Sequence, residues 1–201
     1  MKIRFFLLVL TGLICDFTIA QKVTDYSKIT KPNNFYIGLG SGVNYNCGLI
    51  GIKLTGRIND KILIDASAGV GTWGNKLGLG IILNAKNENA WCPTISFSRA
   101  TGIESTPLTI EVVNSSGYKT SSTIDVKISP ANMVNIGLQR QWIRPTGNRI
   151  TLELGYSVLV SGGEATLLNP AYSFTDVSKK VFDLLRPGGL TVGFGYYFAL
   201  N

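Results

Sequence analysis

The feature that most constrains the fold is a repeated alternation of apolar residues with small or polar ones. From Leu190 to Leu200 every second residue is large and apolar, and the residues between them are Thr, Gly, Gly, Tyr and Ala. Successive side chains of a β-strand point to opposite faces, so this pattern predicts a strand with one apolar face. The same alternation recurs in seven earlier segments, at residues 35–45, 50–58, 62–71, 77–84, 91–98, 134–142 and 150–160.

The residues between the apolar positions favour a membrane barrel over a soluble sheet. A soluble sandwich also alternates, but its exposed face should be rich in Lys and Glu. Here that face is rich in Gly, and only 15% of the chain is charged, against roughly 25% in typical soluble domains. Small residues suit a narrow, crowded barrel interior. We therefore predict an all-β, transmembrane, antiparallel up-and-down barrel, whose strands are long enough to cross a bilayer at a tilt. The alternative is a secreted soluble β-domain.

The N-terminus has the three parts of a secretory signal peptide. Lys2 and Arg4 precede an apolar stretch at 5–14, and Ala20 supplies a small residue before Gln21. We expect residues 1–20 to be the signal peptide, 21–33 an N-terminal periplasmic tail and 34–201 the barrel domain. An uncleaved anchor and a lipid-modified Cys15 are the alternatives.

Short turns fix the predicted register, because a slip of one residue would exchange the two faces of a strand. A hairpin turn at Gly74-Asn75, a turn centred on residues 87–89 and one centred on Thr146 each pair polar faces with polar faces. The expected partners are Gly71 with Gly78, Asn84 with Cys92, and Gln141 with Thr151.

Two long connections, at about 99–131 and 161–188, lie on the same end of the predicted barrel. In the first, segments 107–114 and 118–129 form a hairpin that continues the flanking strands and pairs Trp91 with Arg140. Pro107 and Pro130 would interrupt its ladder. Counting these segments as membrane strands would give ten; we favour eight, since 107–114 is short for a span.

The second long connection contains a predicted helix at 175–186, which begins after a capping residue and ends before Pro187-Gly188-Gly189. One face carries Val177, Val181, Phe182 and Leu185. We expect this helix to lie over the barrel mouth; alternatively, it contacts lipid headgroups or a partner.

Two sets of residues are candidates for a structural or functional role. Lys53, Arg57, Asp65 and Glu153 fall on the interior face, where unpaired charges are costly. They predict a salt-bridge network that fills a narrow barrel, or alternatively a polar conduit. Aromatic residues at strand ends predict interfacial girdles. Those expected at the periplasmic end are Phe35, Trp91, Trp142 and Phe198, and those expected near the outer rim are Tyr45 and Trp73.

Several function classes are disfavoured. The chain has no His, so Ser–His catalysis cannot form, and no paired carboxylates stand out. We expect no catalytic activity, no cofactor, no metal site and no nucleic-acid partner. The positive charge suits anionic lipid headgroups, and Arg99, Lys179, Lys180 and Arg186 all lie at the predicted outer side. Export would permit a disulfide between Cys47 and Cys92.

Three stretches carry a resemblance to a known family: Ala20-Gln21, the Gly-rich segment 36–42 and the terminal segment 193–198. The chain resembles small bacterial outer-membrane β-barrels of the OmpX-like and opacity type, especially the short barrels of Bacteroidetes. The resemblance implies location in the outer membrane of a Gram-negative cell and delivery by the barrel-insertion machinery. The family usually ends on an aromatic residue, whereas Ala199-Leu200-Asn201 follow Phe198 here.

The resemblance and the residues together predict a structural or surface-interaction barrel. Its outer loops would contact outer-membrane lipids, lipopolysaccharide or a protein partner. A narrow pore, or a barrel that assists transport or secretion, is the alternative role.

Overall fold

The computed structural model of the chain describes residues 34–83 and 91–200. The predicted signal peptide at 1–20, the predicted N-terminal tail at 21–33, the predicted turn at 87–89, Asn84 and Asn201 lie outside the described residues. All described residues belong to one compact unit that begins at Pro32. Among them, no helix is both long enough and apolar enough to cross a membrane.

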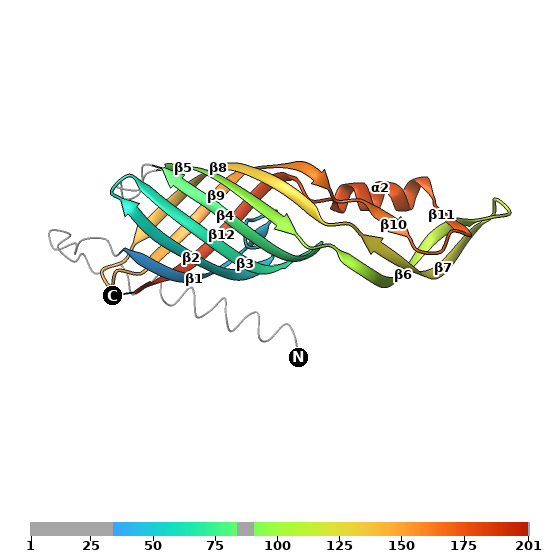
Figure 1. Ribbon diagram of the computed structural model, residues 1–201, viewed down its shortest axis with the longest axis horizontal. Coiled ribbons are helices and arrows are strands. Elements are labelled where there is room, and N and C mark those ends of the chain that lie inside the picture. Colours follow the sequence, from blue (N-terminus) through green and yellow to red (C-terminus); the bar gives the residue numbers. More distant parts are fainter. Residues whose placement is uncertain (1–33, 84–90, 201) are drawn as a thin grey trace, which may run out of the picture. The chain divides into compact units, whose positions relative to one another are not determined.

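Eight antiparallel strands form a closed barrel in the order β1-β12-β9-β8-β5-β4-β3-β2, with β2 pairing back to β1 (Figure 1). Neighbours in this ring follow one another in the chain, apart from elements inserted between them, and the last strand closes the ring against the first. The barrel strands are β1 (Phe35–Val43), β2 (Ile50–Asn59), β3 (Ile62–Gly71), β4 (Gly74–Leu83), β5 (Trp91–Ala100), β8 (Ala131–Ile143), β9 (Arg149–Gly162) and β12 (Gly189–Leu200). The predicted eight-strand barrel is confirmed, and the ten-strand alternative is wrong.

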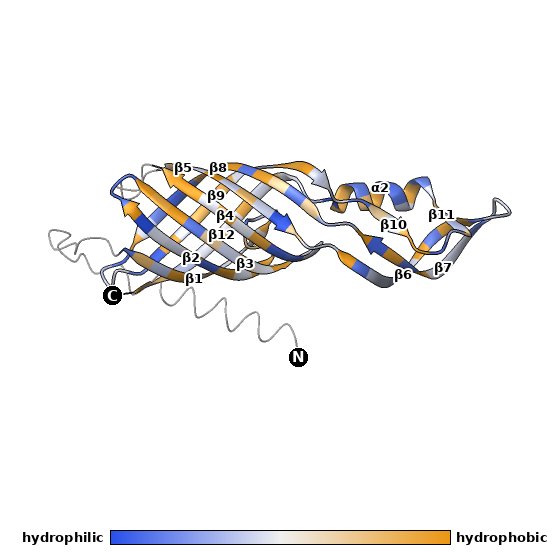
Figure 2. Ribbon diagram, in the orientation of Figure 1, coloured by the Kyte–Doolittle hydropathy of each residue, from blue (hydrophilic) through white to orange (hydrophobic). Residues whose placement is uncertain are grey.

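The two faces of each barrel strand follow the predicted alternation. Along β5, for example, Trp91, Ile95 and Phe97 are exposed on the outside, whereas Cys92 and Ser98 are fully buried inside. Figure 2 shows hydrophobic residues recurring along all the barrel strands. The apolar side chains therefore form the outer wall, and the small and polar ones fill the interior.

The pairing register agrees with two predictions and corrects a third. Gln141 pairs with Thr151 and Trp91 with Arg140, as expected. The predicted Asn84–Cys92 pair lies outside the described residues, but the described pairs of β4 and β5 keep the same register.

The predicted Gly71–Gly78 pair is wrong, because the turn occupies Thr72-Trp73 and Gly71 pairs with Gly74. Gly74 has φ +89° and lies so close to the Gly102 carbonyl that a Cβ atom would overlap it. This position therefore requires glycine, and the turn lies two residues before the predicted one. The displacement is an even number of residues, so the faces of β3 and β4 are unchanged.

A second, four-stranded sheet has the order β10-β7-β6-β11. Its central hairpin is β6 (Ile103–Asn114) and β7 (Lys119–Ile128), and its edges are β10 (Ala165–Leu167) and β11 (Tyr172–Phe174). The hairpin continues the β5–β8 ladder, since Ala100 pairs with Ala131 and Ile103 with Ile128. The predicted projecting hairpin is confirmed, whereas β10 and β11 were not predicted.

The two prolines of the hairpin behave differently. Pro130 separates β7 from β8, as expected. Pro107 lies within β6, opposite Asp125, so the prediction that it interrupts the ladder is wrong. The outer edge of β6 is unpaired there, because β11 reaches only Val112–Asn114. An edge strand tolerates proline, which lacks the N–H that a neighbour would need.

The predicted helix is α2 (Asp176–Leu185), and Thr175 caps its N-terminus by accepting a hydrogen bond from the Ser178 amide. We call β6, β7, β10, β11 and α2 the sheet-and-helix module. A hydrophobic core joins this module to the end of the barrel. Its buried members are Trp73, Ala100, Val126, Ile128, Ala131 and Met133.

Candidate functional site

The barrel interior contains an ion-pair cluster built from three strands. Lys53 of β2 forms a salt bridge with Asp65 of β3, and its Nζ lies 3.7 Å from Oε2 of Glu153 on β9. The three side chains are at most 6% exposed. Two strands, β1 and β12, separate β2 from β9 in the ring, so this cluster links non-adjacent parts of the wall. Three of the four predicted interior charges therefore meet, and Arg57 does not join them.

Two tyrosines complete the cluster. Tyr45 lies with its ring centroid 5.3 Å from Lys53 Nζ, and its hydroxyl is 3.3 Å from that of Tyr197 on β12. Tyr45 was expected at the outer rim, and that expectation is wrong, since the side chain is fully buried. Asn44 has φ +50°, which breaks the strand alternation immediately before Tyr45 and turns its ring inward.

Glycines on the interior face provide the space for these side chains. A Cβ atom on Gly193 would overlap the ring of Tyr45, and one on Gly38 would overlap the ring of Tyr197. A Cβ atom on Gly80 would likewise overlap the Asp65 carboxylate. The small residues that marked the interior face in the sequence are thus the counterpart of a few large polar side chains that fill the barrel.

A second polar group lies toward the barrel end where β1 starts and β12 finishes. Arg149, the first residue of β9, is 2% exposed and lies with Cζ 4.0 Å from the ring centroid of Tyr36. Arg57 of β2 is partly buried near the same end. The sequence analysis missed Arg149. The signal was available, because Arg149 lies two and four residues before Thr151 and Glu153 and therefore on the same interior face of the strand.

The predicted interface aromatics divide into two groups. Phe35, Trp91 and Phe198 are 39–62% exposed on the outer wall, and Trp142 is half-buried beside Arg140. All four lie near the barrel end that carries the first residue of β1. Trp73 departs from the prediction: it is 4% exposed and its Nε1–H donates to the Leu185 carbonyl. It packs into the core shared with the sheet-and-helix module instead of facing outward.

Helix α2 packs along the second sheet and does not lie across the barrel mouth, which corrects the predicted position. Ser178 Oγ donates to the Glu111 carbonyl of β6 at 2.7 Å, and the Phe182 ring packs against Phe174 of β11. Of the predicted apolar face, only Phe182 is packed in this way. The remaining apolar side chains of the helix are exposed: Val177, Val181, Leu184 and Leu185.

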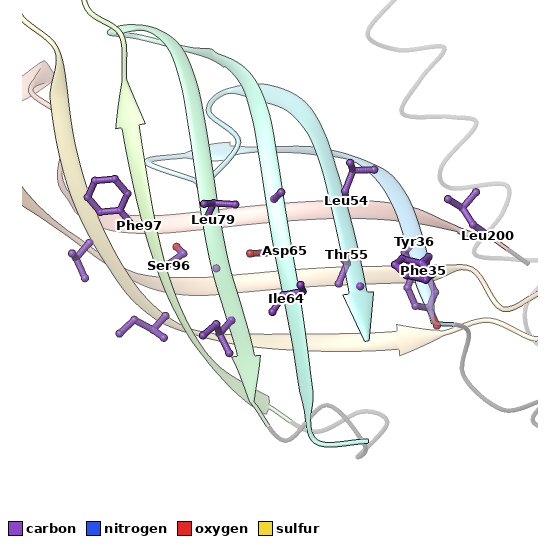
Figure 3. Close-up of a pocket in the computed structure, with 16 residues that line it drawn as sticks. Phe35, Tyr36, Leu54, Thr55, Ile64, Asp65, Leu79, Ser96, Phe97 and Leu200 are labelled. Atoms are coloured by element: carbon purple, nitrogen blue, oxygen red, sulfur yellow. The ribbon is translucent and has the colours of Figure 1, made fainter. Parts of the chain in front are cut away.

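The outer wall of β2 to β5 has an apolar groove of about 730 Å³ (Figure 3). Its origin is a small residue among large ones, because Ala66 pairs with Leu54 on one side and Leu79 on the other. Ile64, Ile81 and Phe97 add to the lining. Such a groove fits hydrocarbon and offers little polar chemistry.

Reactive and metal-binding chemistry is sparse in the described part of the chain. No group of three or more His, Cys, Asp and Glu residues there could hold a metal ion. Cys47 and Cys92 are buried and form no disulfide, and Cys92 Sγ accepts a hydrogen bond from Gln141 Nε2 at 3.5 Å. Both interior carboxylates, Asp65 and Glu153, are engaged by Lys53.

Comparison with protein-family models gives no match, and a search of curated protein sequences also gives none.

Proposed function

We propose that the chain is an integral β-barrel of the bacterial outer membrane, with a structural or surface-interaction role and no catalytic activity. The observation that carries this proposal is the outer wall. Each barrel strand exposes large apolar side chains there, such as Leu39 (57%), Leu79 (66%) and Ile136 (58%). Monomeric soluble proteins rarely expose a continuous apolar patch of more than a few hundred Å². Hydrocarbon tails would cover this wall, and closure of the sheet leaves no unpaired strand edge in the lipid.

The connections support one orientation in the membrane. The turns after β2 and β8 are short, whereas the whole sheet-and-helix module is inserted after β5 and β9. Outer-membrane barrels have short periplasmic turns and longer extracellular loops. The end with Phe35 and Leu200 would therefore face the periplasm, and the module would face the cell exterior.

The barrel interior supports a structural role over a pore. Five side chains meet across it, and each is at most 6% exposed: Lys53, Asp65, Glu153, Tyr45 and Tyr197. An eight-stranded barrel has an interior just wide enough for side chains to fill. Ions would have to displace a paired and buried cluster, so we expect no stepwise current in planar bilayers. Steps of constant conductance from the purified protein would favour the narrow-pore alternative.

The exposed surface of the module supports an interaction role. Val177, Val181 and Leu184 form an apolar stripe on α2, and Lys180 borders it. The stripe continues toward the barrel wall, because Leu184 and Leu185 line one cavity together with Val43 and Leu49. We propose that outer-membrane lipid, including lipopolysaccharide, contacts the module along this stripe.

Cell fractionation and gel migration test the membrane proposal. The mature chain should sediment with outer membranes, require detergent for extraction and migrate faster unheated than boiled on SDS gels. A double substitution that destroys the wall, Leu39→Lys with Ile136→Lys, should abolish the heat-sensitive band. Exposed Lys119→Glu in the module is the matched control and should keep it. A monomeric chain that stays dissolved in buffer without detergent would refute the proposal.

A further inference from the structure

Two arginines occupy the barrel interior, and neither forms an ion pair with an acidic side chain of the described residues. Arg149 is only 2% exposed, and Arg57 is partly buried at the same end of the barrel. Both ion pairs within residues 34–83 and 91–200 involve Lys53. Both arginines lie near Tyr36, because the Arg57 amide donates to the carbonyl of Asn34, two residues before Tyr36, and Cζ of Arg149 lies 4.0 Å from the Tyr36 ring centroid. Within the described residues, two cationic side chains therefore lie at one end of the barrel interior, and no carboxylate there forms an ion pair with either of them.

The hydrogen-bonding groups of this cluster are also unpartnered. Nε and Nη2 of Arg57, the same two atoms of Arg149 and the Tyr36 hydroxyl are all buried without a hydrogen-bond partner in the described residues. A buried guanidinium with unmet N–H groups is costly, and burial of a charge is normally accompanied by a counter-charge. A missing anion would account for both the charge and the unmet donors.

Neighbouring parts of the ring place these donors at one end of the barrel interior. Arg57, Tyr36 and Arg149 come from β2, β1 and β9, and in the ring only β12 lies between β1 and β9. The Tyr36 ring lies against the guanidinium of Arg149, with Cζ 4.0 Å from the ring centroid. Arg57 keeps part of its surface exposed, and β2 ends two residues later at Asn59. The cluster is therefore reached from the barrel end rather than through the wall.

We propose that Arg57, Arg149 and Tyr36 form a binding site for a small tetrahedral oxyanion of the phosphate type. Guanidinium groups present paired N–H donors that match the oxygens of such an anion, and two of them can hold it from different strands. The donors lie on the interior face, so a headgroup attached to acyl chains in the bilayer does not reach them. The proposal concerns the barrel interior and does not depend on the membrane location.

Thermal unfolding of the full mature chain, refolded in detergent, tests the site with inorganic phosphate as the probe. The unfolding midpoint should rise with phosphate and saturate in the low millimolar range, relative to NaCl at equal ionic strength. Arg149→Gln should abolish this saturable rise, and Arg57→Gln should weaken apparent affinity by about tenfold. Arg144→Gln changes a half-buried arginine in the β8–β9 turn and is the matched control, so it should respond like the original chain.

General stabilisation by phosphate is separable from binding. Exclusion of the salt from the protein surface raises the midpoint without saturation and equally in every variant. That result, or an Arg149→Gln chain with an unchanged saturable response, would overturn the proposal. If Arg149→Gln does not fold, Tyr36→Phe and the partly exposed Arg57→Gln provide the test. Unaltered phosphate affinity in both would likewise overturn it.

Discussion

The proposal that lipid covers the outer wall predicts a large, depth-dependent cost for a charge at Ile136. This residue lies in the middle of β8, where it pairs with Ile95 and Tyr156, and it is 58% exposed. An arginine facing lipid at the bilayer midplane costs roughly 2–4 kcal/mol. The same change on a water-exposed surface usually alters stability by no more than about 0.5 kcal/mol.

Phe35 provides the matched control, because it is 62% exposed but lies at the first position of β1, near the barrel end. There an arginine should cost only about 0–1 kcal/mol. Ile136→Arg should therefore unfold more readily than Phe35→Arg by about 2–3 kcal/mol, or roughly 30- to 150-fold in the equilibrium constant.

The assay is reversible unfolding by guanidinium chloride from phospholipid vesicles, followed by tryptophan fluorescence. Equal free energies of unfolding for the two variants, or an Ile136→Arg change that stays within about 0.5 kcal/mol of the original chain, would refute a lipid-covered wall.

Three further predictions concern the interior, a thiol and the helix. Gly193→Ala should lower the free energy of unfolding by about 1–3 kcal/mol because the added methyl overlaps the Tyr45 ring; adding Tyr45→Ala should restore part of the loss, and additive losses would contradict the packing argument. Burial raises the pKa of the Cys47 thiol, in the β1–β2 turn, to about 11. Its alkylation, followed by peptide mass spectrometry, should still accelerate about tenfold between pH 9 and 10, and a plateau near pH 9 would indicate an ordinary thiol. Thr175→Ala should remove the N-cap of α2 at a cost of about 1 kcal/mol and speed amide hydrogen exchange in its first turn; exposed Lys180→Ala should not, and equal exchange in both variants would contradict the capping role.

The barrel could be predicted because its strands depend on a local property of the sequence. Alternation assigns the faces, and every even displacement in register preserves them. This is why the misplaced turn at Gly74-Asn75 left the faces of β3 and β4 correct. The β6–β7 hairpin was predictable for the same reason, since both of its segments alternate on either side of a turn-forming sequence.

The errors arose where the environment of a residue depends on distant parts of the chain. Strict alternation along the strand would place Tyr45 on the outer wall, but the positive φ of Asn44 directs its side chain into the interior. Trp73 is buried because α2, more than a hundred residues later, supplies a carbonyl acceptor at Leu185. Strands β10 and β11 have three residues each. They form only because β7 and β6 offer free edges, so no local sequence pattern predicts them.

The interior site was partly predictable. The alternation of residues placed Lys53, Asp65 and Glu153 on the interior face. It could not show which of them would meet, because that depends on the closure of the ring. Arg57 shares their face and still lies apart, four residues further along β2 than Lys53. Distances along the barrel axis, which depend on the stagger of neighbouring strands, separate these two groups.

The turn between β6 and β7 has a practical consequence for engineering. Asn114 closes it by accepting hydrogen bonds from the amides of Ser116 and Tyr118, and Ser115 is exposed. A side chain at Gly117 would meet no neighbour within 4 Å, although its φ of +83° favours glycine. Lengthening a loop fourfold costs only roughly 1 kcal/mol in chain entropy. A foreign epitope grafted between Ser115 and Ser116 should therefore be displayed at the surface while β6 and β7 remain paired by their backbone hydrogen bonds.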